Sequence, residues 1–268
     1  MTNSKAPNAG KSSASAALPS TNTPTARFAA LWLAWAGLLA AAMILGNQQA
    51  HGGFWPTALR MGSSAVLVIT AWYACSMWPG TKVATFALAI AVGMTLGAIG
   101  DLFNAGWLGF VPMADPTLGG IVAFGLGHVA YVAGCVYLAR AGGLRDRRAM
   151  LISVVGWQLI GLAAWYGVVM LGAERRGLAW PALGYTLLLA GTAGVTAGLA
   201  LQDRRLFPLA LGAALFLTSD LILAFELFRG PFAHDTECVW LTYGPGQMLI
   251  VFSILAAAGV LGEPRADT

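Results

Sequence analysis

Charged side chains are scarce in this sequence: Asp, Glu, Lys and Arg together make up 10% of its 268 residues. About a quarter of the residues of a soluble domain are charged, so the composition excludes an ordinary soluble protein. Hydrophobic residues reach 58%, and the mean hydropathy is +0.72. The chain is therefore predicted to be an integral membrane protein.

Cysteine is scarce as well. Cys75, Cys135 and Cys238 are too few and too far apart for a disulfide framework, and no Cys-x-x-Cys pair is present. His128 has no second histidine at ligand spacing, so no metal site and no cofactor are predicted.

Two nucleophile patterns are missing. No Gly-x-Ser-x-Gly elbow occurs, which disfavours a serine hydrolase. The lysines are Lys5, Lys11 and Lys82, none of them deep in an apolar stretch, which excludes a retinal-type Schiff base.

Long apolar stretches are abundant. A hydrocarbon core of about 30 Å needs about 20 residues of helix, and eight such stretches can be drawn: 28–46, 60–78, 83–105, 118–139, 149–171, 178–201, 206–228 and 239–261. The predicted fold class is an all-α polytopic bundle of about eight transmembrane helices. Its helical domain covers residues 27–262.

Polar segments flank this domain. Residues 1–26 are rich in Ser, Thr, Ala, Pro and Asn, and they are predicted to form a disordered tail because they contain no apolar run. The apolar run from Phe28 is long enough to span, so it is expected to stay as a helix rather than to act as a cleavable signal. Residues 263–268 form a short polar C-terminal tail.

Basic residues indicate the orientation, since they accumulate on the cytoplasmic side. Eleven of the fifteen fall on the side of the N-terminus, and four on the other: Arg60, Arg175, Arg176 and Arg229. Both termini are therefore predicted to be cytoplasmic, in a bacterial-type plasma (inner) membrane. The net charge of +4 is explained by this asymmetry and does not indicate a nucleic-acid partner.

Polar side chains inside the apolar stretches are the candidate functional residues, because an intramembrane ionisable group is costly unless it is paired, protonated or facing water. They are Asp101, Asn104, His128, Tyr131, Tyr185, Ser219, Asp220, Tyr243 and Gln247. At a rise of about 1.5 Å per residue, members from five helices fall about 6 to 15 Å from the outer helix ends. The sequence thus predicts one polar cavity in the outer half of the membrane.

Two carboxyl groups that differ in their exposure to water suit general acid/base chemistry. Asp220 lies deeper than Asp101, which makes Asp220 the expected acid and Asp101 the expected base. Simpler interpretations stay open: Asp101 is also consistent with a carboxylate at the water interface. His128, the tyrosines and Gln247 are consistent with interhelical hydrogen bonding.

Four segments resemble, in order and spacing, the motifs of the YhhN family, the membrane lysoplasmalogenases: "GAIGD" (97–101), "FGLGHVAY" (124–131), "GAALFLTSDLILA" (212–224) and "TYGPGQMLI" (242–250). "WPALGY" (180–185) resembles the tyrosine-bearing sixth helix of the family, and the similarity covers roughly residues 28–261. The resemblance implies an intramembrane hydrolase that cleaves the vinyl ether bond of lysoplasmalogens.

The resemblance also implies residue roles and partners. Asp101 and Asp220 would be catalytic, and the other polar side chains would orient water, the ether oxygen or the head group of a lysophospholipid in the bilayer. Two other functions stay open, a proton-coupled transporter and a non-catalytic lipid-binding membrane protein. Nothing in the sequence specifies an oligomeric state.

Overall fold

The computed structural model describes residues 24–48, 53–113, 115–172 and 174–262. The helix α1 begins at Pro24, so the last three residues of the predicted N-terminal tail are helical. The rest of that tail and the predicted C-terminal tail lie outside the described residues.

Within these ranges the chain forms eight helices that are long and apolar enough to cross a membrane. They are α1 (Pro24–Gln48), α2 (Phe54–Met77), α3 (Lys82–Asn104), α4 (Pro116–Ala141), α5 (Arg147–Trp165), α6 (Ala179–Gln202), α7 (Phe207–Arg229) and α8 (Asp235–Val260). A π-helical turn (Tyr166–Met170) extends α5, and 3-10 turns precede α6 (Arg176–Leu178) and α7 (Arg204–Leu206). The predicted all-α membrane fold is confirmed.

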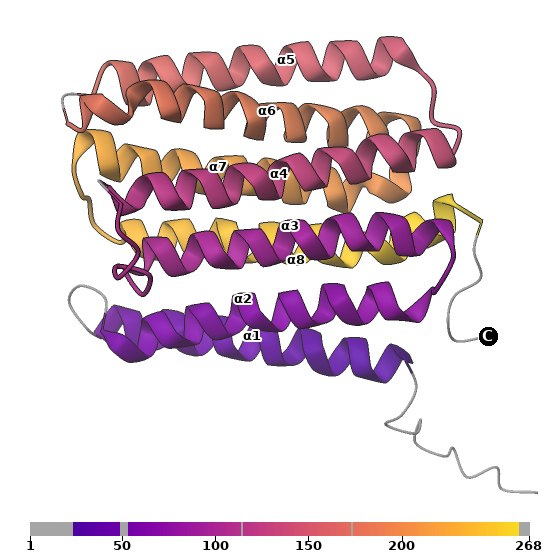
Figure 1. The fold of residues 1–268 in the computed structure, drawn as a ribbon, viewed down its shortest axis with the longest axis horizontal. Helices are drawn as coiled ribbons and strands as arrows, with labels where there is room; N and C mark the ends of the chain where they lie inside the picture. The colour runs from indigo at the N-terminus through magenta and orange to yellow at the C-terminus, as the bar shows by residue number, and fades with distance from the viewer. Residues whose placement is uncertain (1–23, 49–52, 114, 173, 263–268) are drawn as a thin grey trace, which may run out of the picture.

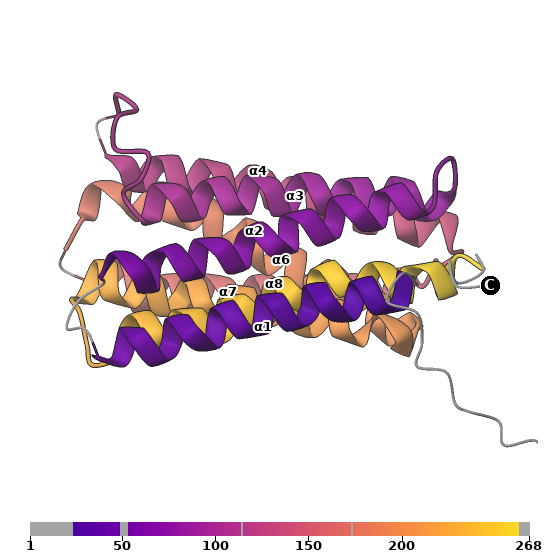
Figure 2. The same cartoon turned by 90° about the horizontal axis from the view of Figure 1, so that it is seen from below.

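The helices run along one long axis (Figures 1 and 2). Successive helices pack as neighbours with the exception of α4 and α5; α4 packs against α6 instead, and α3 packs against α8, so that the two halves of the chain meet. In Figure 1, α1 and α5 lie at opposite edges of the bundle, with α3, α4, α7 and α8 between them. Helices α2, α3, α4, α6, α7 and α8 therefore enclose the interior in which the polar residues meet.

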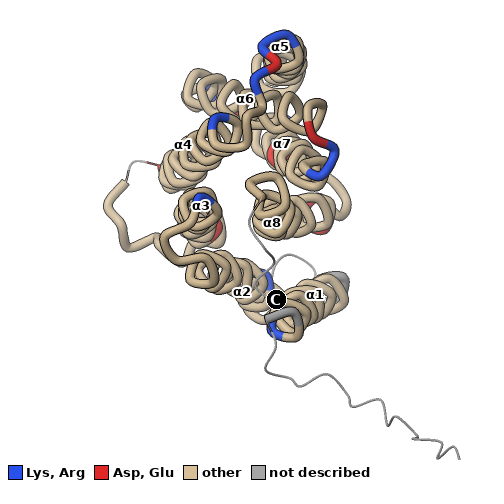
Figure 3. The backbone as a smooth tube through the Cα atoms, turned by 90° about the vertical axis from the view of Figure 1, so that its right-hand side faces the viewer, with Lys and Arg blue, Asp and Glu red and all other residues tan. Residues whose placement is uncertain are grey.

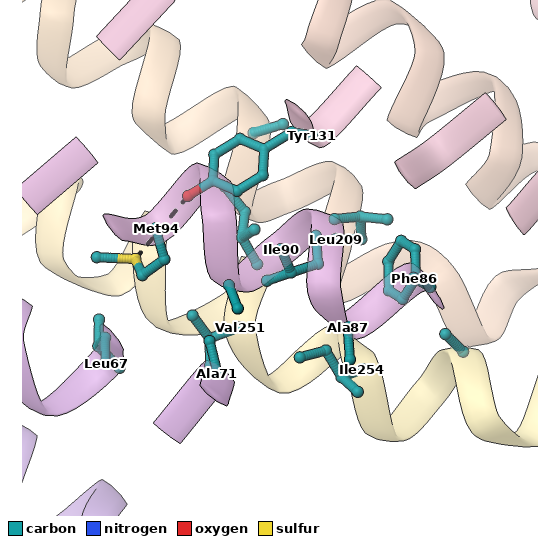
Figure 4. Packing of buried hydrophobic residues seen from close by; sticks show 14 of the residues in the cluster. Leu67, Ala71, Phe86, Ala87, Ile90, Met94, Tyr131, Leu209, Val251 and Ile254 are labelled. Carbon is teal, nitrogen blue, oxygen red and sulfur yellow. Dashed lines mark hydrogen bonds between the residues drawn. The ribbon is translucent and has the colours of Figure 1, made fainter. Parts of the chain in front are cut away.

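Helix α3 supplies the centre of the apolar core. Its Phe86, Ile90 and Met94 are fully buried against residues of other helices, among them Leu67 of α2 and Ile254 of α8 (Figure 4). The three α3 residues recur at four-residue spacing, so they lie on one face of the helix, which is turned towards α2 and α8. The packed centre fixes the register of the helices that carry the site.

Charged residues gather near helix ends. Figure 3 looks at the end of the bundle where α1 begins and α8 finishes, and it shows the few blue and red segments against a largely uncharged bundle. The described basic residues at this end include Lys82, Arg140, Arg147, Arg204 and Arg205. Both described chain ends lie on this side, while its assignment to the cytoplasm stays a prediction.

Glycines allow two pairs of helices to approach closely. A methyl group added at Gly93 of α3 would lie 2.9 Å from the carbonyl oxygen of Gly127 in α4. A methyl group at Gly212 of α7 would lie 2.7 Å from the carbonyl oxygen of Gly246 in α8. Small residues permit such backbone contact between membrane helices.

We expect Gly212→Ala to destabilise the protein by about 1–3 kcal/mol, because backbone atoms of α8 must move to admit the methyl group. The matched control is Gly156→Ala in α5, where the added carbon has no neighbour within 4 Å. The control should be neutral or slightly stabilising. Thermal unfolding in detergent compares the two variants. Equal changes in Tm would contradict the close packing of α7 on α8.

Candidate active site

Asp101 lies near the end of α3 in a hydrogen-bonded pocket. Its side chain is only 4% exposed. Ser64 of α2 donates to its Oδ2 at 2.6 Å, and Tyr243 of α8 is also hydrogen-bonded to this carboxyl group. Gln247 completes the network, since its amide nitrogen donates to the Tyr243 hydroxyl and its Oε1 accepts from Ser64 at 3.5 Å. Three helices therefore hold one carboxyl group in place.

Asp220 of α7 has its own pair of donors. The hydroxyl of Tyr185 on α6 donates to Oδ2, and Ser219 donates to Oδ1 at 3.2 Å. Asp220 is partly exposed, whereas its depth in the sequence predicted it to be the more buried of the two aspartates. That prediction is wrong because α2 and α8 cover Asp101, while Asp220 faces open space on two sides. The two carboxyl groups are close enough to interact electrostatically.

A polar cavity of about 290 Å³ joins the two aspartates. It is lined by Thr57, Arg60, Met61, Asp101, Asn104, Ala105, Phe124, Asp220, Leu223, Glu226, Thr236, Val239, Trp240 and Tyr243. The lining includes the first turns of α2 and α8 and the last turns of α3 and α7. The cavity therefore lies towards the end of the bundle opposite the start of α1, where the sequence predicted it.

A smaller apolar slot of about 60 Å³ lies between α4, α6 and α7. Most of its lining is aliphatic, including Ala182, Leu189, Leu217 and Leu227, and Tyr185 stands in the same wall. The slot shares four lining residues with the polar cavity: Asn104, Phe124, Asp220 and Leu223. Asp220 thus stands where a polar space meets an apolar one, whereas Asp101 lines the polar cavity alone.

Glycines make room for two of the shared residues. A methyl group at Gly100 would lie 2.6 Å from the ring of Phe124, and one at Gly120 would lie 2.7 Å from Oδ1 of Asn104. The Phe124 ring also packs edge-on against Phe216. The boundary between cavity and slot is thus built into the contact between α3 and α4.

Four of the predicted site residues line neither the polar cavity nor the apolar slot, and they pack behind the residues that do: Ser219, Gln247, His128 and Tyr131. Ser219 and Gln247 are fully buried supports for Asp220 and for the Asp101 network. His128 bonds through Nδ1 to Thr192 at 3.0 Å, while Tyr131 donates to the sulfur of Met94 (Figure 4).

The sequence interpretation missed Arg60 and Glu226, both of which line the cavity. The predicted second span begins at Arg60, and Glu226 is not among the predicted site residues. Helix α2 begins six residues earlier, at Phe54, so Arg60 lies within the helix and is buried. Hydropathy alone could not show this, because "FWPTALR" combines interfacial aromatics with polar residues and does not resemble a hydrocarbon-spanning segment.

Asp115, at the start of α4, lies outside both spaces. Its side chain accepts a hydrogen bond from the Thr117 amide at 2.9 Å, and the hydrogen bonds from Thr117 hold the pKa of Asp115 below its usual range. It is a helix cap rather than a site residue. Within the described residues no group of three or more His, Cys, Asp and Glu side chains could hold a metal ion.

The fold and the site define an integral membrane protein of the polytopic α-helical class, with two aspartates facing a cavity within the bundle. The model of the YhhN family matches residues 55–254, and the chain belongs to that family. No curated protein and no solved structure matches the chain.

Cysteine labelling tests the position of the cavity. In a chain whose three native cysteines are replaced, Thr57→Cys should react with a membrane-impermeant thiol reagent applied from the outer side, because Thr57 lines the cavity. Thr70→Cys, on the same helix but fully buried, should not react.

Labelling of Thr57→Cys only from the cytoplasmic side would contradict the predicted orientation. Equal labelling of both variants would contradict the packing of α2.

Proposed function

We propose that this protein hydrolyses the vinyl ether bond of lysoplasmalogens, releasing a fatty aldehyde and a glycerophospho-head group. The observation that carries the proposal is the position of Asp220, which lines both the polar cavity and the apolar slot. The vinyl ether bond likewise lies between a polar and an apolar part of the substrate, since it joins a polar glycerol unit to an apolar chain.

This arrangement would orient a single-chain lipid along the line from the cavity to the slot. The head group belongs in the polar cavity, where Asp101, Asn104 and Tyr243 offer hydrogen-bonding groups. The start of the alkenyl chain belongs in the slot, among aliphatic residues, because apolar surface is stabilised away from water. The vinyl ether then lies beside Asp220, and the remainder of the chain can stay in the bilayer.

The chemistry needs one proton donor and one proton acceptor. The acid transfers a proton to the vinyl carbon on the chain side, and an oxocarbenium ion forms at the carbon bonded to oxygen. Water adds to that carbon while a base takes its proton, and the resulting hemiacetal collapses to the aldehyde. The glycerol oxygen leaves as a hydroxyl group, so one water molecule is consumed.

The geometry favours Asp220 as the acid and Asp101 as the base. Asp220 borders the slot in which the chain-side carbon would lie, whereas Asp101 lines only the polar cavity that admits water. The ionised carboxylate also stabilises the developing cation. Tyr185 and Ser219 fix the rotamer of Asp220, and Ser64 and Tyr243 fix that of Asp101.

Asp101→Asn and Asp220→Asn should each reduce aldehyde release from a lysoplasmenyl lipid by about 100-fold or more, the scale of a missing general acid or base. Both substitutions keep size and hydrogen-bonding capacity while removing the titratable proton. Purified protein in detergent, with a saturated ether lipid as the blank, gives the measurement. Asp115→Asn is the matched control, because asparagine also caps helices and should retain activity.

Activity in either variant close to that of the wild type would remove that aspartate from the mechanism. Absence of release by folded wild type would overturn the hydrolase, and dependence of transport on an ion gradient would then favour a transporter.

Tyr185→Phe should reduce the rate by about 10-fold or more while leaving the fold intact, because it removes a hydrogen bond to a catalytic carboxyl group. Tyr131→Phe is the matched control. Among the described residues its hydroxyl is hydrogen-bonded to the sulfur of Met94, at 3.9 Å, and to neither aspartate, and Tyr131 lines neither space. Steady-state kinetics compare the two variants. An equal loss of rate in both would show that these tyrosine hydroxyls affect activity through packing alone.

A further inference from the structure

Arg60 is a buried cation that the hydrolytic steps do not use. It is 4% exposed and lines the polar cavity. Its only ion pair among the described residues is a long one, 3.7 Å from Nη2 to Oε1 of Glu237. Its Nε has no hydrogen-bond partner in the described structure. Since a guanidinium group carries five N–H donors, this side chain has donors left for a ligand in the cavity.

We propose that Arg60 binds the phosphate of the lysolipid head group and that Glu226 binds its amine. The inference rests on the proposed function for the identity of the lipid. A guanidinium group matches a phosphate in shape and charge, and it binds two oxygens at once. A buried position strengthens this interaction because water competes less for both partners.

The spacing of the residues on α2 fits such a ligand. Arg60 lies one turn before Ser64, whose hydroxyl donates to Asp101. Four residues of helix rise about 6 Å. Five bonds separate the ether oxygen of the lipid from phosphorus, also about 6 Å when extended, since three bonds of extended chain span about 3.5 Å. A phosphate at Arg60 would therefore leave the ether oxygen level with the aspartates.

Glu226 supplies the opposite charge on the other wall. It lies six residues after Asp220 on α7, about 9 Å along the helix, and it lines the same cavity. No ion pair of Glu226 occurs among the described residues. The amine of an ethanolamine or choline head group extends about 5 Å beyond phosphorus, so it can reach Glu226 while the phosphate stays at Arg60.

A purely structural role for Arg60 predicts something different. If the pair with Glu237 serves to join α2 to α8, then loss of either partner should destabilise the protein and weaken every lipid alike. If Arg60 binds phosphate, its loss should weaken only lipids that carry phosphate. Glu237 is not part of the cavity lining, so its loss should leave the preference for phosphate in place.

The test measures binding rather than turnover. Full-length protein in detergent is titrated with a saturated 1-alkyl lysophosphoethanolamine, its phosphoglycerol analogue and the corresponding 1-alkylglycerol, none of which contains a vinyl ether. Calorimetry gives the affinities, and thermal unfolding reports the fold of each variant.

Arg60→Gln should weaken both phosphate-bearing lipids by about 10- to 100-fold, the scale of charge-assisted hydrogen bonds in a buried site, and leave the alkylglycerol nearly unchanged. Glu237→Gln should keep the wild-type preference for phosphate. Arg60→Lys, which keeps the charge but loses the planar fork, should give a smaller selective loss, and it replaces Arg60→Gln if that variant does not fold. Glu226→Gln should remove the preference for ethanolamine over phosphoglycerol.

Equal loss of all three lipids in the Arg60 variants, or no loss, would overturn the phosphate site. An unchanged preference for ethanolamine in Glu226→Gln would overturn the amine site. These results do not depend on catalysis. Selective binding without aldehyde release would support the head-group site and contradict the proposed reaction. Aldehyde release without selective binding would support the reaction and contradict the head-group site.

Discussion

The cost of placing a carboxyl group inside a membrane is the constraint on which this structure depends. A charged or unpaired polar group in hydrocarbon costs several kcal/mol, and the bundle contains two aspartates facing one interior cavity. Each is held by hydroxyl groups from other residues, Asp101 by Ser64 and Tyr243 and Asp220 by Tyr185 and Ser219. Helices that are distant in sequence must therefore pack together at these positions.

The same packing creates the boundary between polar and apolar space. Glycines in α3 and α4 admit the ring of Phe124 and the amide of Asn104, and both residues line the cavity and the slot. Asp220 stands at this boundary. A soluble enzyme must extract a lipid from the membrane, whereas a site within the bundle can receive the reactive bond while the chain stays in hydrocarbon. We regard this junction, rather than either aspartate alone, as the feature that suits the proposed chemistry.

Hydropathy predicted the eight helices and the depth of the polar residues, because both follow from the length needed to cross the membrane. It did not predict which polar residues line the cavity. Gln247 and Asn104 look alike in the sequence, yet only Asn104 faces open space, and the difference depends on helix rotation set by packing. Arg60 was missed because α2 continues into an interfacial segment that hydropathy does not detect. The order of burial of the two aspartates likewise depends on which helices cover them.

Isotope incorporation during turnover tests the central claim most directly. The wild-type protein is incubated with a lysoplasmenyl lipid in heavy water, and mass spectrometry locates deuterium in any aldehyde that is released and trapped. Proton transfer from an aspartate to the vinyl carbon predicts one deuterium on the carbon next to the aldehyde carbon, because the carboxyl proton exchanges with solvent. An aldehyde without deuterium at that carbon would contradict acid catalysis at the vinyl ether.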